Sequence, residues 1–485
     1  MKALAPLVAA ASLLVANISR ADGPVIVHEW GTFTSLQGES GKAIGGINVD
    51  DEPVPSFVYG AGFVHKLPGA GGEPIYGFGL PPYPMEKGWR PADQDVTMRL
   101  ETPVIYFYPP KDDAQNSALP LTVHVDFHGG LLSQFYPYAE TQGFPNMLNP
   151  QQEIHLADCN SGLTWTVTHF GSAQEPPETP DKVWTTPREV SAPEIEVKGR
   201  TWNQNGGQED TAEAEHFLFY RGIGHLNSPI LVAPNGSGVK GEMEMGAATR
   251  SGISHLNAAW IVDIHENGFC AFRDLAQTEA KDALGPLTKG HVWFPNFSAS
   301  FEKADFRREN LSLLKNSMQT ALEKAGLYHD EASAMLRTWE LSYFKSPGLR
   351  FFYIVPPSWL DKTLPLMITG APADITRVMV GRIELISDEQ KATLARLKQE
   401  ASPDLMDLKQ EAYNAMHSGR YSKKEQVEFE SGARPLTDLG ITLSPSVRDY
   451  LSLGRFRDAL IVHEQAERPS DNLARFIKDN DLAAR

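Results

Sequence analysis

The sequence predicts an α+β protein: a β-sandwich-like antiparallel main domain at 22–386, with a packed helix pair, and then a helical C-terminal region. Three observations predict this class. Short β-branched and aromatic runs alternate with Gly, Pro and Asn up to about residue 300, as antiparallel strands do. Helix-type spacing follows at about 302–345, after which strands return. The remainder, 387–485, is charged and helical in pattern.

The chain starts with a predicted secretory signal peptide, residues 1–21. Lys2 precedes an apolar run that reaches about Ile18, and Ser19 and Ala21 form a small-x-small cleavage site. The apolar core is short for a membrane span. The alternatives are an N-terminal anchor and an ordinary buried helix. Cleavage after Ala21 predicts a secreted or periplasmic protein.

Charge and cysteine content narrow the classes of partner. The formal net charge is −17 over 485 residues, and such a surface repels phosphate backbones, so nucleic acid is not an expected partner. After the signal peptide, no segment has the length and apolarity of a transmembrane helix. Cys159 and Cys270 are the only cysteines. They predict either one disulfide, as an oxidising compartment permits, or two separate buried thiols.

The strand region begins with "PVIVHEWGTFTS" at 24–35 and continues with runs such as "LTVHVDFHG" at 121–129. Asn267-Gly268 is a dipeptide favoured in tight hairpin turns, so it predicts a hairpin there. Two stretches interrupt the strands. The first, 60–94, is rich in Gly and Pro and predicts a long ordered loop, and the polar, Pro-rich 172–212 predicts an insertion or linker.

The helical elements have recognisable starts and ends. An apolar stripe at helical spacing ends at Gly326, and a second helix follows, which together give the predicted pair. Ser387 and Gln390 form a capping box at the start of the C-terminal region. Ser444-Pro445 supplies another N-cap with a first-turn proline.

His124, Asp126 and His128 stand two residues apart and are the candidate ligands for a divalent metal, the only cofactor that the sequence suggests. Imidazole and carboxylate suit zinc and similar ions. On a straight strand, side chains at i and i+4 are about 13 Å apart, so only an i, i+2 pair can share one ion. A bulge at Gly129-Gly130 would change that. The alternative is a solvated polar strand face.

The first predicted strand supplies candidate ligand-binding residues. His28 and Trp30 share one face of this strand, and Glu29 lies on the other. Tryptophan beside small hydroxyls suits sugars or peptides, while a packed core strand is the alternative. Arg221 ends an almost wholly apolar run and is either a surface residue or a buried, paired anchor.

Sequence motifs exclude several catalytic classes. The chain has no G-x-S-x-G elbow and no dinucleotide-binding glycine fingerprint at a strand–helix turn, and "LQGESGKA" at 36–43 lacks key residues of a phosphate loop. Carboxylates suited to glycoside hydrolysis cannot be ranked, because their separation in space decides the chemistry. The candidates are Glu29, Glu101, Asp126, Glu215 and Asp263.

Five ordered blocks resemble a family of large exported bacterial proteins. The blocks are "HEWGTFTS", "ETPVIYFYPP", "FLFYRG", "TWELSYF…GLRFFYIVP" and "VMVGRIELIS", and they span roughly 25 to 390. That family has no established activity, so the resemblance implies export and supplies no catalytic residues.

Together these observations predict an exported binding protein for a glycan, a cell-envelope component or a protein partner. The alternative is a secreted hydrolase that acts on a saccharide through a metal or a carboxylate pair. A third hypothesis is a scaffold whose charged C-terminal helices hold a partner.

Overall fold

The computed structural model describes residues 23–49, 54–60, 92–110, 120–145, 154–172, 174–202, 208–234, 244–249, 256–265, 268–275, 297–422, 425–426, 429, 434 and 436–482. The predicted signal peptide at 1–21 and most of the predicted loop at 60–94 lie outside these residues.

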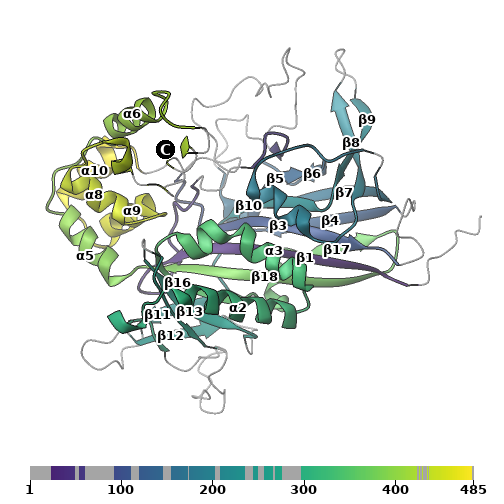
Figure 1. Ribbon diagram of the computed structural model, residues 1–485, viewed down its shortest axis with the longest axis horizontal. Coiled ribbons are helices and arrows are strands. Elements are labelled where there is room, and N and C mark those ends of the chain that lie inside the picture. The colour runs from purple at the N-terminus through teal and green to yellow at the C-terminus, as the bar shows by residue number, and fades with distance from the viewer. Residues whose placement is uncertain are drawn as a thin grey trace, which may run out of the picture.

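A large, mostly antiparallel sheet of 15 strands dominates the fold (Figure 1). Its main path runs β14-β13-β16-β18-β1-β3-β10-β5-β7-β4-β17, and β1 and β18 form its long parallel pair. The prediction of a mixed protein built on antiparallel strands is therefore confirmed, whereas the sandwich arrangement stays a prediction. The strands are β1 (Val25–Gln37), β2 (Tyr59–Gly60), β3 (Met98–Tyr108), β4 (Leu121–His128), β5 (Gly130–Tyr136), β6 (Glu140–Gln142), β7 (Asn160–Phe170), β8 (Ile195–Trp202), β9 (Gln208–Glu215), β10 (Leu218–Gly224), β13 (Ala259–Ile264), β14 (Cys270–Asp274), β16 (Gly348–Ile354), β17 (Leu366–Thr369) and β18 (Ala373–Leu385).

A second, three-stranded sheet has the order β11-β12-β15. It consists of β11 (Ile230–Pro234), β12 (Glu244–Thr249) and β15 (Phe297–Ser298).

The central strand β1 is buried on both faces, and its side chains alternate between two apolar cores. Trp30 packs in one core and Phe33 in the other. This is the period-two alternation of a strand. Because neighbours such as β18 follow the same alternation, the sheet separates the two cores.

One of these cores is covered by helices. α2 (Glu309–Lys324) and α3 (His329–Thr338) lie over the central strands, and a π-helical turn, Glu340–Lys345, follows α3 (Figure 1). Leu314, Met318 and Leu322 of α2 are buried against the sheet, as their helical spacing predicts. α2 ends just before Gly326, whose positive φ of 116° suits glycine.

The described residues from 387 to 482 contain helices and no strand. They pack on the sheet through a shared core in which Leu36 and Ile223 meet Leu394 and Leu460. Both predicted N-caps are confirmed, because the Ser387 and Ser444 hydroxyls accept first-turn backbone N–H groups. These helices are α5 (Asp388–Leu397), α6 (Leu405–Met416), α8 (Pro445–Ser452), α9 (Arg457–Glu467) and α10 (Asp471–Asp479). Two short helices lie earlier, α1 (Lys182–Thr185) and α4 (Pro357–Thr363).

Of the two alternatives for 172–212, an insertion or a linker, the linker is wrong for the part from Ile195 onward. β8 and β9 form an antiparallel hairpin there, and β8 also pairs with β7, so the segment extends the sheet (Figure 1). β9 is "QEDTAEAE" and, among the described strands, pairs only with β8, and its exposed Glu209 and Asp210 suit a strand at the edge of the sheet. The hairpin predicted at Asn267-Gly268 is confirmed by the antiparallel pairing of β13 with β14, although Asn267 of the predicted turn lies outside the described residues.

The two cysteines are separate thiols in this structure. Cys159 belongs to the core shared with the C-terminal helices, and Cys270 to the core beneath α2 and α3. Among the described residues, no helix combines the length and apolarity needed to cross a membrane.

Candidate functional site

His124 and Asp126 lie together on the outward face of β4, as their i, i+2 spacing predicts. His124 Nε2 is 3.0 Å from Asp126 Oδ1, and His124 Nδ1 is 2.9 Å from the Thr164 hydroxyl on β7. His128 is separate from this pair, since its Nδ1 contacts the Lys362 carbonyl oxygen at 2.8 Å. The outward face holds a pair, not a triad.

A glutamine from a third strand completes this group. Gln142 Nε2 on β6 lies 3.1 Å from His124 Nε2 and donates to Asp126 Oδ1 at 3.4 Å. Gln142 reaches across Gly162 of β7, where an added Cβ would stand 2.6 Å from Gln142 Nε2 and 2.7 Å from Asp126 Oδ1. Glycine is therefore required at position 162 for this contact.

A shallow hollow lies next to the group, and Thr164 belongs to both. Arg200 on β8 is 3.3 Å from Glu140 of β6, and its guanidinium lies over the Tyr138 ring at 5.7 Å. The hollow thus combines hydroxyls, both signs of charge and one aromatic ring. Its lining residues are Tyr138, Glu140, Thr164, Thr166, Lys198, Gly199 and Arg200.

The candidate binding residues of β1 do not form one surface. Trp30 is fully buried among aromatic side chains, and His28 is 3% exposed, with its Nδ1 2.7 Å from Glu331 of α3. Glu29 points to the opposite core, where Arg377 donates to it. α2 and α3 therefore cover the face that the sequence offers as a binding surface.

Arg221 is also buried, and its Nε donates to the Gln134 side chain on the neighbouring strand β5. Of the two alternatives for this residue, the buried and paired anchor is therefore the one observed.

The five candidate carboxylates are distributed over the sheet. Each is paired with a cationic or histidine side chain: Glu29 with Arg377, Glu101 with Arg99 and Arg455, Asp126 with His124, Glu215 with Arg188, and Asp263 with His265. Within the described ranges, no group of three His, Cys, Asp or Glu side chains is placed to hold a metal ion.

Sequence reasoning missed several polar residues. Gln142, Tyr138 and Arg200 join the site through strand pairing that local sequence does not reveal. It also missed a buried cluster formed by Arg350 of β16 with Arg382 and Glu384 of β18. The alternation in "VMVGRIELIS" places Arg382 and Glu384 on one face of a strand, and this spacing is the sequence feature that could have indicated the cluster.

Comparisons with known proteins give no family. No family model matches the chain, and no curated protein matches it. A solved structure of the Fcho1 Mu homology domain from Danio rerio with bound Eps15 peptide is similar with a TM-score of 0.22 and 7% identity. That match covers 75% of this chain and 95% of the other, and a likeness this low carries no argument.

Proposed function

We propose that this chain is an exported protein that binds a glycan on its outward polar face, in the hollow beside β7. The observation that carries the proposal is the lining of the hollow, in which hydroxyl, carboxylate, ammonium and guanidinium groups from three neighbouring strands surround one tyrosine ring. Sugars present dense hydroxyl groups and apolar ring faces, so they match convergent polar groups with an aromatic side chain.

The surroundings of the hollow support a binding face wider than one residue. Along one row of the sheet, Glu140, Thr164 and His124 are directly opposite one another, and Met367 of the edge strand β17 follows. Met367 is 57% exposed. A ligand lying along this row could hydrogen-bond to the polar side chains at its centre and contact the apolar Met367 at its end.

Export is part of the proposal and rests on the predicted signal peptide and on the resemblance to exported bacterial proteins. The hydrolase alternative has less support, because the candidate carboxylates in the described residues are paired with cations or histidines. A carboxylate pair needs two acids about 5–10 Å apart across one sugar.

A glycan array with purified full-length protein tests the proposal, followed by calorimetry on any glycan retained. Arg200→Met removes a charged donor and is expected to lower affinity about tenfold or more. Thr166→Val removes one hydroxyl at constant shape and is expected to lower affinity about 3- to 10-fold. Thr320→Val, on the exposed surface of α2, is the matched control and leaves affinity unchanged.

An empty array, or a glycan whose affinity neither variant alters, contradicts the proposal. If the array is empty while Arg200→Met loses a protein in pull-downs, the partner is a protein. Sugar released from a retained glycan during incubation indicates the hydrolase alternative.

A further inference from the structure

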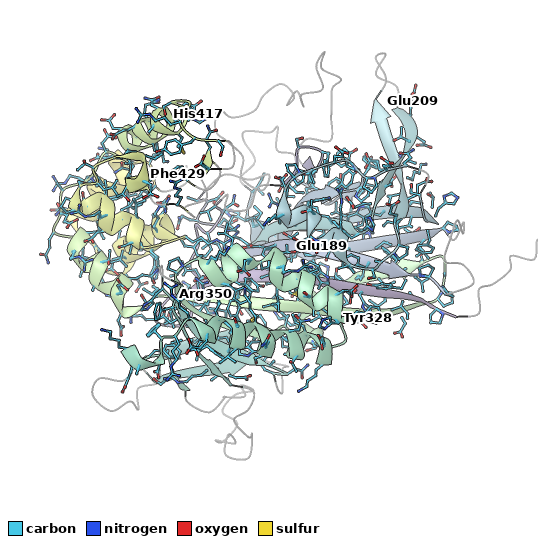
Figure 2. The ribbon with its side chains drawn as sticks, viewed as in Figure 1. Glu189, Glu209, Tyr328, Arg350, His417 and Phe429 are labelled. Atoms are coloured by element: carbon cyan, nitrogen blue, oxygen red, sulfur yellow. The ribbon has the colours of Figure 1, made fainter. Side chains whose placement is uncertain are left out.

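The cluster of Arg350, Arg382 and Glu384 lies within the core beneath the π-helical turn. Arg350 is directly opposite Glu384, and Arg382 is directly opposite Thr34 of β1. Residues opposite one another in neighbouring strands project to the same face of a sheet. Figure 2 shows Arg350 at the end of the sheet near the C-terminal helices. Both arginines are at most 1% exposed, and Glu384 is 8% exposed.

The two Nη groups of Arg350 are well supplied with acceptors. Its Nη1 donates to the carbonyl oxygens of Ser342 and Tyr343 at 3.1 and 3.0 Å, and its Nη2 to that of Pro347 at 3.0 Å. Its Nε is 3.3 Å from Glu384 Oε1, close enough for an ion pair but outside hydrogen-bond geometry. Burial lowers the pKa of Arg350 to about 10, so this guanidinium still carries its charge at neutral pH.

Arg382 is poorly supplied by comparison. Its Nε donates to Glu384 Oε1 at 2.5 Å, and its Nη2 is equally close to that oxygen but outside hydrogen-bond geometry. Among the described residues, neither Nη1 nor Nη2 has a hydrogen-bond acceptor. Within the same part of the chain, the opposing Thr34 hydroxyl has no hydrogen-bond partner.

The cluster is therefore short of both negative charge and hydrogen-bond acceptors around the Arg382 guanidinium. Two guanidinium groups share the carboxylate of Glu384, and Asp263 acts on Arg350 from farther away. Among the described residues, Arg382 forms an ion pair only with this shared carboxylate. Buried guanidinium N–H groups without acceptors are costly. A water molecule could accept hydrogen bonds but would leave the charge, whereas an oxyanion supplies both acceptors and charge.

We propose that this cluster is a binding site for a small oxyanion, either phosphate or a carboxylate, held by the Nη1 and Nη2 groups of Arg382 and by the Thr34 hydroxyl. The planar fork of arginine suits both anions. The site is closed by the π-helical turn, from which the Tyr343 ring faces Arg382 at 5.8 Å. The anion is therefore taken up while the chain folds. This site is separate from the hollow at β7, so a negative result for one proposal does not affect the other.

Refolding of the full chain in matched ionic strengths of phosphate, acetate or chloride tests the proposal. Because the anion binds only the folded state, the folded-to-unfolded ratio rises with its concentration, about 100-fold at 100 times the dissociation constant. A response to phosphate but not acetate identifies a phosphate site, and the reverse identifies a carboxylate site. The same response to all three salts overturns the proposal.

Three variants separate specific binding from the general stabilisation by phosphate that any protein shows. Arg382→Met is expected to lose the specific response. Arg188→Met is the matched control, because Arg188 is paired with Glu215 through two hydrogen bonds; it loses stability but keeps the response. Should Arg382→Met not fold, Thr34→Val removes the hydroxyl at constant shape and is expected to weaken the response several-fold. An unchanged response in Arg382→Met or Thr34→Val contradicts the assignment.

Discussion

Two buried ionic clusters lie on opposite faces of the β1–β18 pair and differ in how fully they are hydrogen-bonded. Glu29 accepts from the Tyr220 hydroxyl and from Arg377 Nε at 2.6 Å, and Arg377 Nη2 donates to the Leu364 carbonyl at 2.7 Å. Burial and the nearby Glu29 raise the pKa of Tyr220 far above its ordinary value, so it remains a donor. Arg382, by contrast, has two nitrogens without an acceptor in the part of the chain that the structure describes.

Burial of a charged side chain therefore does not by itself distinguish a structural ion pair from a ligand-binding group. A closed cluster such as that of Glu29 is satisfied by the chain and needs nothing further. An open cluster such as that of Arg382 lacks acceptors among the described residues, and this is the basis of the oxyanion proposal.

Breaking the closed cluster is expected to have the largest effect on stability. Glu29→Gln keeps the size of the side chain but leaves the Arg377 charge buried with only its weak outer partner, Asp361, at 3.3 Å. Loss of one member of a buried ion pair costs about 3–5 kcal/mol. Denaturant unfolding measures the change.

Asp361→Asn is the control for this experiment, because Asp361 is 66% exposed in its pair with Arg377. Exposed pairs contribute about 0–1 kcal/mol. Equal effects of Glu29→Gln and Asp361→Asn would show that the Glu29 cluster is not a closed, buried unit.

The two cysteine thiols differ in their access to solvent, and their reactivity is expected to differ accordingly. Burial and the nearby Asp263 raise the pKa of Cys270 to about 12, and Cys270 is fully buried. The thiolate is the reactive form, so its fraction at pH 8 is roughly 1,000-fold below that of an ordinary cysteine. Native alkylation of Cys270 is therefore expected to be very slow and to accelerate with each pH unit beyond pH 9.

Peptide mapping after timed alkylation distinguishes Cys270 from Cys159, which is 9% exposed and is expected to react first. Complete alkylation of both after unfolding, without a reductant, is expected for two free thiols. Protection of both until a reductant is added indicates that the protein forms the disulfide instead.

Much of this fold follows from the sequence, because its strong signals are local. The alternation of Trp30 and Phe33, the helical stripe of α2 and the turn at Gly268 each need only neighbouring residues. The linker alternative at 172–212 failed because β8 shows only a short apolar alternation, Ile195 and Val197, and the acidic β9 has no apolar residue larger than alanine. Pairing of β8 with β7 and of β9 with β8 stabilises this hairpin.

The candidate sites were less predictable, because pairing between distant strands assembles them. The i, i+2 spacing gave His124 and Asp126, but Gln142 reaches them from β6 across Gly162. Arg382 meets Thr34 through the register of β18 on β1, which no local pattern in the sequence specifies.

Two buried tryptophans also differ in whether the indole N–H has a hydrogen-bond acceptor. Trp184 Nε1 donates to Glu215 Oε2 at 2.8 Å, whereas the Nε1 of Trp30 has no acceptor among the described residues. Both indoles are at most 1% exposed. Trp184→Phe removes a hydrogen bond to a buried carboxylate and is expected to cost about 1–3 kcal/mol more than Trp30→Phe. Equal losses in urea unfolding would mean that packing, not hydrogen bonding, dominates at both positions.

The smallest expected effect comes from the outward face, where side chains can move into solvent. Gly162→Ala places a methyl group between Gln142 and Asp126, which must separate. Because Gln142 is exposed and free to turn away, the loss of unfolding free energy is expected to be about 1 kcal/mol, at the low end for overpacking.

Ser161→Ala is the comparison variant. Ser161 precedes Gly162 on β7, and its buried hydroxyl accepts the Leu132 N–H. Loss of this hydrogen bond is expected to cost at least as much stability as Gly162→Ala. A Gly162→Ala loss well above that of Ser161→Ala would show that the outward cluster is as rigid as the core.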